Sequence, residues 1–159
     1  ATLFGNAAPG GVINRVTKKP LEYNRRSVTL TAGSFNTTRA FGDFTGPLNA
    51  QASLLYRLNL GYENTDGFRD LQALTTFTVA PSITYVASER TRFNADLMIS
   101  ANNGKIDRGL AVFGDGPLSS RPITASQSAA NDYLREKNIN LTLGLTHRLA
   151  QHLPLFHLR

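Results

Sequence analysis

Three arginines in the middle of the chain could attract an anionic ligand. Arg57 and Arg92 stand at alternate positions of segments whose other face is apolar, and Arg69 stands in a polar connection. Cations that line a water-filled passage or its outer mouth raise the local concentration of an anion. Pairing within the protein is the alternative that the sequence favours, and the nearby carboxylates are those of Glu63, Asp70 and Asp96.

Aromatic residues in the polar connections could contact an apolar part of the same ligand. They are Phe68, Phe113 and Tyr133. Packing of these rings within their own loops is the alternative. The connection 102–137, which carries two of them, is long and rich in glycine, so it could fold over a bound ligand, and disorder of this connection is the alternative.

Other kinds of chemistry find little support. The chain has no Cys, and His147, His152 and His157 are five residues apart with no carboxylate cluster beside them, so we expect no metal site. No Ser–His–Asp arrangement or carboxylate pair stands out, and we expect no enzyme and no cofactor. The basic stretch with Lys18, Lys19, Arg25 and Arg26 lacks the interleaved aromatic residues of single-strand nucleic-acid binders.

Strict alternation of apolar and polar residues predicts the elements that carry these side chains. Between 53 and 63, one face holds Leu54, Tyr56, Leu58, Leu60 and Tyr62, and only Leu55 breaks the two-residue period. The same period recurs along the chain, and we predict strands at 27–35, 38–46, 53–63, 74–85, 91–101 and 138–148. A seventh strand could begin near Leu153.

The length of these strands and their connections indicate a membrane setting. Strands of this length exceed those of most soluble sheets and approach what a tilted strand needs to cross a bilayer. Connections at one end are short (47–52, 86–90 and 150–152), and those at the other include 64–73 and 102–137. This arrangement is typical of bacterial outer-membrane barrels. We therefore expect an all-β fold, part of an antiparallel transmembrane β-barrel, with lipid on the apolar face and a hydrated lumen on the polar face.

The aromatic residues of the apolar face support the same orientation. Tyr62 and Phe77 fall near the outer strand ends, and the inner ends carry Phe44, Tyr56, Tyr85 and Phe93. Two aromatic belts around an aliphatic band are the pattern of a barrel in a bilayer, whereas the core of a soluble sandwich is the alternative. Pro81 lies on this face and cannot donate a ladder hydrogen bond, so we expect a bulge or a missing bond there. We also expect Leu58→Arg to impair assembly and Arg57→Ala to leave it intact.

Composition narrows the class of protein further. The chain has 159 residues, a net charge of +6 and 41% hydrophobic residues, with no apolar run long enough for a transmembrane helix. It begins at Ala1 without a visible signal peptide and ends on a His-containing tail at Arg159. We expect a piece of a longer protein.

The chain resembles the TonB-dependent outer-membrane receptors. In that family a Leu-Tyr-Gly, a Pro-Gly-Gly, an Ile-Asn and a basic run ending in proline precede the barrel, and here they stand as Leu3-Phe4-Gly5, Pro9-Gly10-Gly11, Ile13-Asn14 and Thr17-Lys18-Lys19-Pro20. Further matches follow in order: Gly33-Ser34-Phe35, Asp43 with Thr45-Gly46-Pro47-Leu48, Tyr56-Arg57-Leu58, Phe68-Arg69-Asp70 and Ala80-Pro81-Ser82.

The resemblance implies a function as well as a fold. It implies the end of a plug domain at 1–22 and the first part of a 22-stranded barrel at 23–159, in a receptor of the ferrichrome and pyoverdine type. Such a receptor binds a ferric siderophore outside and releases it inward when the TonB complex pulls on a segment upstream. Phe4, where tyrosine is usual, would be a ligand contact without the hydroxyl. A passive porin-type channel and a soluble basic β-protein that binds nucleic acid are the alternatives.

Overall fold

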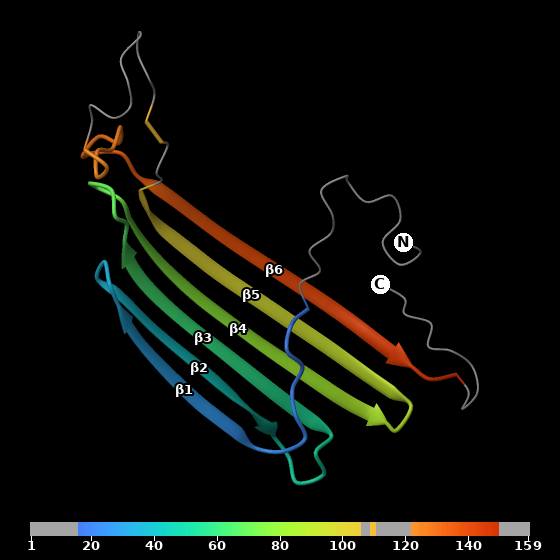
Figure 1. Cartoon of the computed structure of the whole chain (residues 1–159). Helices are drawn as coiled ribbons and strands as arrows, with labels where there is room; N and C mark the ends of the chain where they lie inside the picture. Colours follow the sequence, from blue (N-terminus) through green and yellow to red (C-terminus); the bar gives the residue numbers. More distant parts are fainter. Residues whose placement is uncertain (1–15, 106–108, 111–121, 150–159) are drawn as a thin grey trace.

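The computed structural model describes residues 16–105, 109–110 and 122–149. Within them, six antiparallel strands form one sheet in sequence order (Figure 1). They are β1 (Arg25–Gly33), β2 (Thr37–Pro47), β3 (Leu54–Asp66), β4 (Ala73–Ser88), β5 (Thr91–Lys105) and β6 (Leu134–His147). The all-β, antiparallel fold class is confirmed, and the seventh strand expected near Leu153 lies outside the described residues. The part of the chain that is described contains no helix with the length and hydropathy to cross a membrane.

The strands extend beyond the predicted ones, chiefly at the outer end, where the connections 34–36, 67–72 and 106–133 lie. There both faces carry polar residues, so the alternation fades while the backbone ladder continues to the pair Asp66↔Ala73. Side-chain hydrogen bonds accompany it, from Thr75 Oγ1 to Asn64 Oδ1 at 2.9 Å and between the hydroxyls of Thr37 and Thr65 at 2.7 Å. The connection 67–72 is consequently as short as the inner connection 48–53, so the expected sorting of connections by length rests on 89–90 and 106–133 alone.

The strand register gathers the apolar side chains on one face of the sheet. Rows such as Phe44–Leu58–Pro81 and Tyr62–Phe77–Ala101 run across neighbouring strands on this face. Tyr85 and Phe93 stack at the inner end with ring centroids 6.3 Å apart. Within the described residues no second layer covers this face, so its large hydrophobic side chains are partly or largely exposed. Leu55, the residue that breaks the alternation, lies with the polar set and is buried.

Pro81 interrupts the sheet without shifting it. The pairing of β4 with β5 stops after Val79↔Ile99 and resumes in the same register at Ser82↔Asp96. The proline ring removes a hydrogen-bond donor from the ladder. Of the two expected outcomes, the strand therefore shows the missing hydrogen bond and not the bulge. The register shift in this pair of strands lies instead between Val86 and Ser88, beside the tight inner turn.

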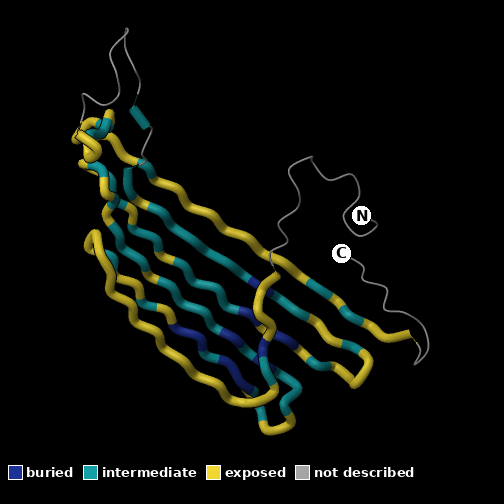
Figure 2. Tube along the Cα trace, in the orientation of Figure 1, coloured by how far each residue is buried: buried dark blue, intermediate teal, exposed yellow. Residues whose placement is uncertain are grey.

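A segment without regular structure, residues 16–24, crosses the polar face near the inner ends of the strands (Figure 2). We call it the N-terminal segment. The buried residues gather where it crosses, and most of them are polar or charged: Asp43, Thr45, Arg57, Ser82, Thr84 and Asp96. Among the described residues, the most enclosed region is therefore a polar contact between this segment and the sheet.

Candidate functional site

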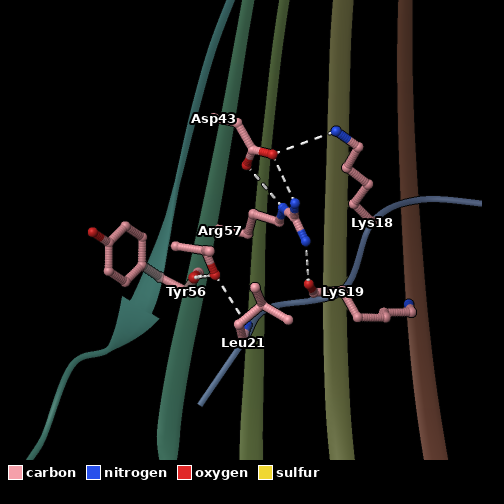
Figure 3. Close-up of polar contacts among 7 residues, drawn as sticks. Lys18, Lys19, Leu21, Asp43, Tyr56 and Arg57 are labelled. Atoms are coloured by element: carbon pink, nitrogen blue, oxygen red, sulfur yellow. Dashed lines mark hydrogen bonds and ion pairs between the residues drawn. The ribbon is translucent and has the colours of Figure 1, made fainter. Parts of the chain in front are cut away.

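The centre of the polar contact is an ion pair between β2 and β3 (Figure 3). Arg57 Nε donates to Asp43 Oδ1 at 2.9 Å and Arg57 Nη2 donates to Asp43 Oδ2 at 2.7 Å. The register Asp43↔Asn59 and Thr45↔Arg57 makes the two residues diagonal neighbours on the polar face. Their side chains are only 6% and 7% exposed. Two parallel bonds from one guanidinium give this pair a fixed orientation as well as charge complementarity.

The N-terminal segment adds polar contacts to both members of this ion pair. Arg57 Nη1 donates to the backbone carbonyl of Lys19 at 2.8 Å, and Lys18 Nζ lies 3.4 Å from Asp43 Oδ2. Farther along, the Leu21 amide donates to Thr45 Oγ1 at 2.9 Å, and that hydroxyl donates to the Tyr56 carbonyl at 2.8 Å. Backbone and side-chain groups of the segment thus bind to groups that β2 and β3 present from one face.

A second carboxylate holds the same segment from β5. Lys19 Nζ lies 2.7 Å from Asp96 Oδ2, and Thr17 Oγ1 donates to the same oxygen at 3.4 Å. Ser82 of β4, which faces Asp96 in the register, donates its hydroxyl to the other carboxylate oxygen. We call Asp43, Arg57 and Asp96, together with Lys18 and Lys19, the clamp. Each buried acid of the clamp has a positive partner. Arg57 and Lys18 pair with Asp43, and Lys19 pairs with Asp96.

The partners of the predicted lumen cations differ from those that the sequence favoured. Arg57 pairs with Asp43 rather than with Glu63, Asp70 or Asp96, because Asp43 is its diagonal neighbour. Glu63 pairs instead with Arg39, directly opposite it in the register, at 2.8 Å. Arg92 reaches Glu22 of the N-terminal segment at 3.1 Å.

The outer end of the sheet brings two other predicted residues together. Arg69 Cζ lies 5.3 Å from the centroid of the Phe68 ring, a cation–π distance. Their connection also touches the segment that leads into β6: Arg69 Nη1 donates to the Ala125 carbonyl at 3.5 Å and the Asp70 amide donates to the Thr124 carbonyl at 2.7 Å.

The other predicted ligand residues are not gathered into that group. Tyr133, just before β6, is 82% exposed, and Phe4 and Phe113 lie outside the described residues. Arg57 lies nine positions before Asp66 on β3, about 30 Å along an extended strand. It therefore belongs to a different region from Phe68 and Arg69.

The described residues contain no cluster of His, Cys, Asp or Glu side chains that could hold a metal ion. His147 shares a hydrogen bond of 2.9 Å between its Nδ1 and Thr91 Oγ1, and His152 and His157 lie outside the described part of the chain. Sequence reasoning missed Asp43 as the partner of Arg57. The available signal was its position between Phe41 and Thr45 on the face of Arg39.

Comparison with known proteins identifies relatives of one kind. No family model matches the chain. The metal-pseudopaline receptor CntO of Pseudomonas aeruginosa is 36% identical over 109 residues, which cover 69% of this chain and 15% of that receptor. The ferrioxamine receptor of Yersinia enterocolitica is 31% identical over 121 residues, 74% of this chain and 16% of the relative. The chain thus spans about one sixth of the length of these curated relatives.

A solved structure shows the same fold. Pseudomonas aeruginosa FpvA, bound to heterologous pyoverdines, matches with a TM-score of 0.76 at 19% identity over 84% of this chain and 18% of the other. The relatives are receptors rather than enzymes, and they favour the receptor interpretation over a passive porin or a soluble nucleic-acid-binding protein. Shared sequence with siderophore receptors and a sheet that matches one of their barrels lead to one conclusion: this chain belongs to the TonB-dependent siderophore receptors of the outer membrane.

Proposed function

We propose that the whole protein imports a metal–siderophore complex across the outer membrane by energy-coupled transport. In this proposal residues 1–22 are the end of a plug that fills the barrel, and residues 23–159 are the first part of the barrel wall. The TonB complex supplies the energy by pulling on a plug segment outside this chain. Iron is the metal that the ferrioxamine and pyoverdine relatives suggest, and the ligand is cargo rather than a resident cofactor.

The clamp is the observation that carries this proposal. A passive porin keeps a water-filled passage open. Here the N-terminal segment is instead bound to the polar face. Arg57 donates to the Lys19 carbonyl, and Lys18 and Lys19 pair with the buried carboxylates of Asp43 and Asp96. A plug bound to the lumen wall has to be displaced or rearranged before a ligand can pass, which is why transport of this kind needs an energy source.

Phe68 and Arg69, which we call the outer group, supply the proposed ligand contacts. Phe68 is half-exposed and Arg69 stacks on it, so the pair offers an apolar surface beside a positive charge to an anionic chelate. We assign Tyr133 to the same outer mouth with Phe4 and Phe113 as further contacts, and we assign Arg57 to the clamp, where it positions the plug end.

Uptake by whole cells tests the proposal. A strain without its own siderophore receptors would express the whole protein and receive radioiron-labelled ferrioxamine B, ferrichrome or ferripyoverdine, or radiometal-labelled pseudopaline. We expect accumulation of at least one complex, and loss of that accumulation when TonB is deleted. Uptake that persists without TonB, or no uptake of any of the four by protein that is assembled in the outer membrane, contradicts the proposal.

A pair of variants tests the outer group. Phe68→Ala should raise the dissociation constant of the transported complex about tenfold, the effect of losing one aromatic contact. Leu71→Ala is the matched control, because Leu71 lies in the same connection and is 47% exposed, as Phe68 is. Equal affinities of the two variants, measured by equilibrium binding to isolated outer membranes, would remove Phe68 from the ligand site.

A further inference from the structure

The N-terminal segment is attached to the sheet at almost every position between residues 17 and 22. Five of these six residues bond a side chain of the sheet, and the sixth, Pro20, is buried. The bonds join Thr17 and Lys19 to Asp96, Lys18 to Asp43, the Lys19 carbonyl to Arg57, Leu21 to Thr45 and Glu22 to Arg92. The chain is therefore held on the polar face before it enters β1.

These attachments are spread over four neighbouring strands. The bonded side chains belong to β2 (Asp43 and Thr45), β3 (Arg57) and β5 (Arg92 and Asp96). Ser82 of β4 donates its hydroxyl to Asp96 and so supports that carboxylate. Each of these four strands is paired on both sides within the described sheet. A load on the segment, which crosses the strands on the polar face (Figure 2), is consequently divided among strands that have neighbours on either side.

β1 is the element that would take this load if the segment were detached. It begins at Arg25, opposite Thr45 and near the inner ends of the strands. An inward pull on Arg25 acts along the axis of β1 and loads its ladder with β2 in shear. A slip of one residue would turn Val28 and Leu30 from the apolar face to the polar face. Attachment of the chain upstream of Arg25 therefore protects the register of the sheet.

We infer that the clamp is the fixed end of the plug. When the upstream part is pulled inward, residues 17–22 stay on the sheet and pass the load to β2–β5, so that it does not reach β1. This inference rests on the proposed function, in which the pull comes from upstream. The burial of the clamp supports a long-lived attachment: the side chains of Asp43, Arg57 and Asp96 are only 6–7% exposed, so water cannot replace their bonds one at a time.

Constant-force pulling on the N-terminal end of the whole receptor, held in a lipid bilayer, tests this inference. The applied force replaces TonB, so the measurement does not depend on siderophore uptake. In the wild type we expect the extension to stop once the chain is drawn out to residue 16. A later step of at most about 28 Å, residues 17–24 fully extended, reports release of the segment. Lys18→Gln with Lys19→Gln should shorten the lifetime of the stop about tenfold, corresponding to roughly 1.4 kcal/mol.

Two further variants separate the clamp from the rest of the sheet. Asp43→Asn with Asp96→Asn weakens the contact from the side of the sheet and should also shorten the stop. Arg39→Gln with Glu63→Gln is the control, because it removes an exposed ion pair of the same hairpin that does not touch the segment. Migration in an unheated gel shows that each variant is folded before it is pulled.

The pulling traces decide the inference by themselves. Shorter stops in both clamp variants, with a control that matches the wild type, support it. Equal lifetimes in the wild type and both clamp variants overturn it, and so does a wild-type trace without a stop at residue 16. Absence of siderophore uptake would contradict the proposed function instead and would leave these traces unchanged.

Discussion

The hairpin of β2 and β3 carries two arginine–carboxylate pairs that share their chemistry and differ in their cover. In both, one guanidinium makes two bonds to one carboxylate: Arg57 to Asp43 at 2.9 and 2.7 Å, and Arg39 to Glu63 at 2.9 and 2.8 Å. The first pair is 7% and 6% exposed, and the second is 52% and 35% exposed. The N-terminal segment covers the first pair only, through the carbonyl of Lys19 and the ammonium of Lys18.

This difference shows what the segment contributes energetically. An exposed ion pair adds little to stability, because water and salt screen both charges. When a segment excludes water from the same arrangement, removal of one partner leaves a charge that neither water nor protein compensates. The segment therefore makes the pair beneath it indispensable, and the pair in turn makes the attachment of the segment specific.

Removal of the buried guanidinium is expected to have the largest effect. Arg57→Met should lower the free energy of unfolding by about 3 kcal/mol, the lower end of the range for a broken buried pair, because Lys18 remains near Asp43. The measurement is urea unfolding of the whole receptor in lipid vesicles, followed by circular dichroism. This differs from the sequence-based expectation that Arg57→Ala leaves assembly intact, because the sequence did not show that the N-terminal segment covers this arginine.

Arg39→Met is the matched control for that measurement, since it removes the same group from the exposed pair on the same hairpin. Its unfolding curve should stay close to that of the wild type. The double variant Asp43→Asn with Arg57→Met should recover part of the loss, because no unpaired charge then remains. Equal destabilisation by Arg39→Met and Arg57→Met would show that cover by the segment does not distinguish the two pairs.

The next largest effect is a difference in destabilisation between arginines introduced on the two faces of the sheet. Leu58 lies in the middle row of the apolar band, so Leu58→Arg should destabilise the membrane-assembled protein by about 2–4 kcal/mol. Thr78→Arg introduces the same charge on the polar face, and its effect should be far smaller. The fraction of each variant that migrates as folded protein in an unheated gel reports assembly. Equal fractions would contradict the assignment of the faces.

The sequence predicted the features that each strand determines by itself, namely its position in the chain and the face on which each residue lies. The two-residue period located all six strands and assigned Leu58 and Arg57 to opposite faces, since that period needs no knowledge of the neighbours. Which residues meet across strands depends on register, and a shift of one residue exchanges every partner. Asp43 was therefore missed as the partner of Arg57, and Glu63, Asp70 and Asp96 were named instead. The path of residues 16–24 has no period at all, so only the structure could place Lys19 against Asp96.

The smallest effect isolates a single bond between the segment and the sheet. Thr45 is buried, and its hydroxyl accepts from the Leu21 amide and donates to the Tyr56 carbonyl. Thr45→Val keeps the shape of the side chain and removes both bonds, so the Leu21 amide should exchange its hydrogen about five- to tenfold faster, corresponding to roughly 1 kcal/mol. Thr84→Val is the control, because Thr84 is equally buried but bonds Asn94 rather than the segment. If the two variants leave exchange at Leu21 equally unchanged, the clamp depends on its charges alone, and the contrast between the two arginine pairs is then purely electrostatic.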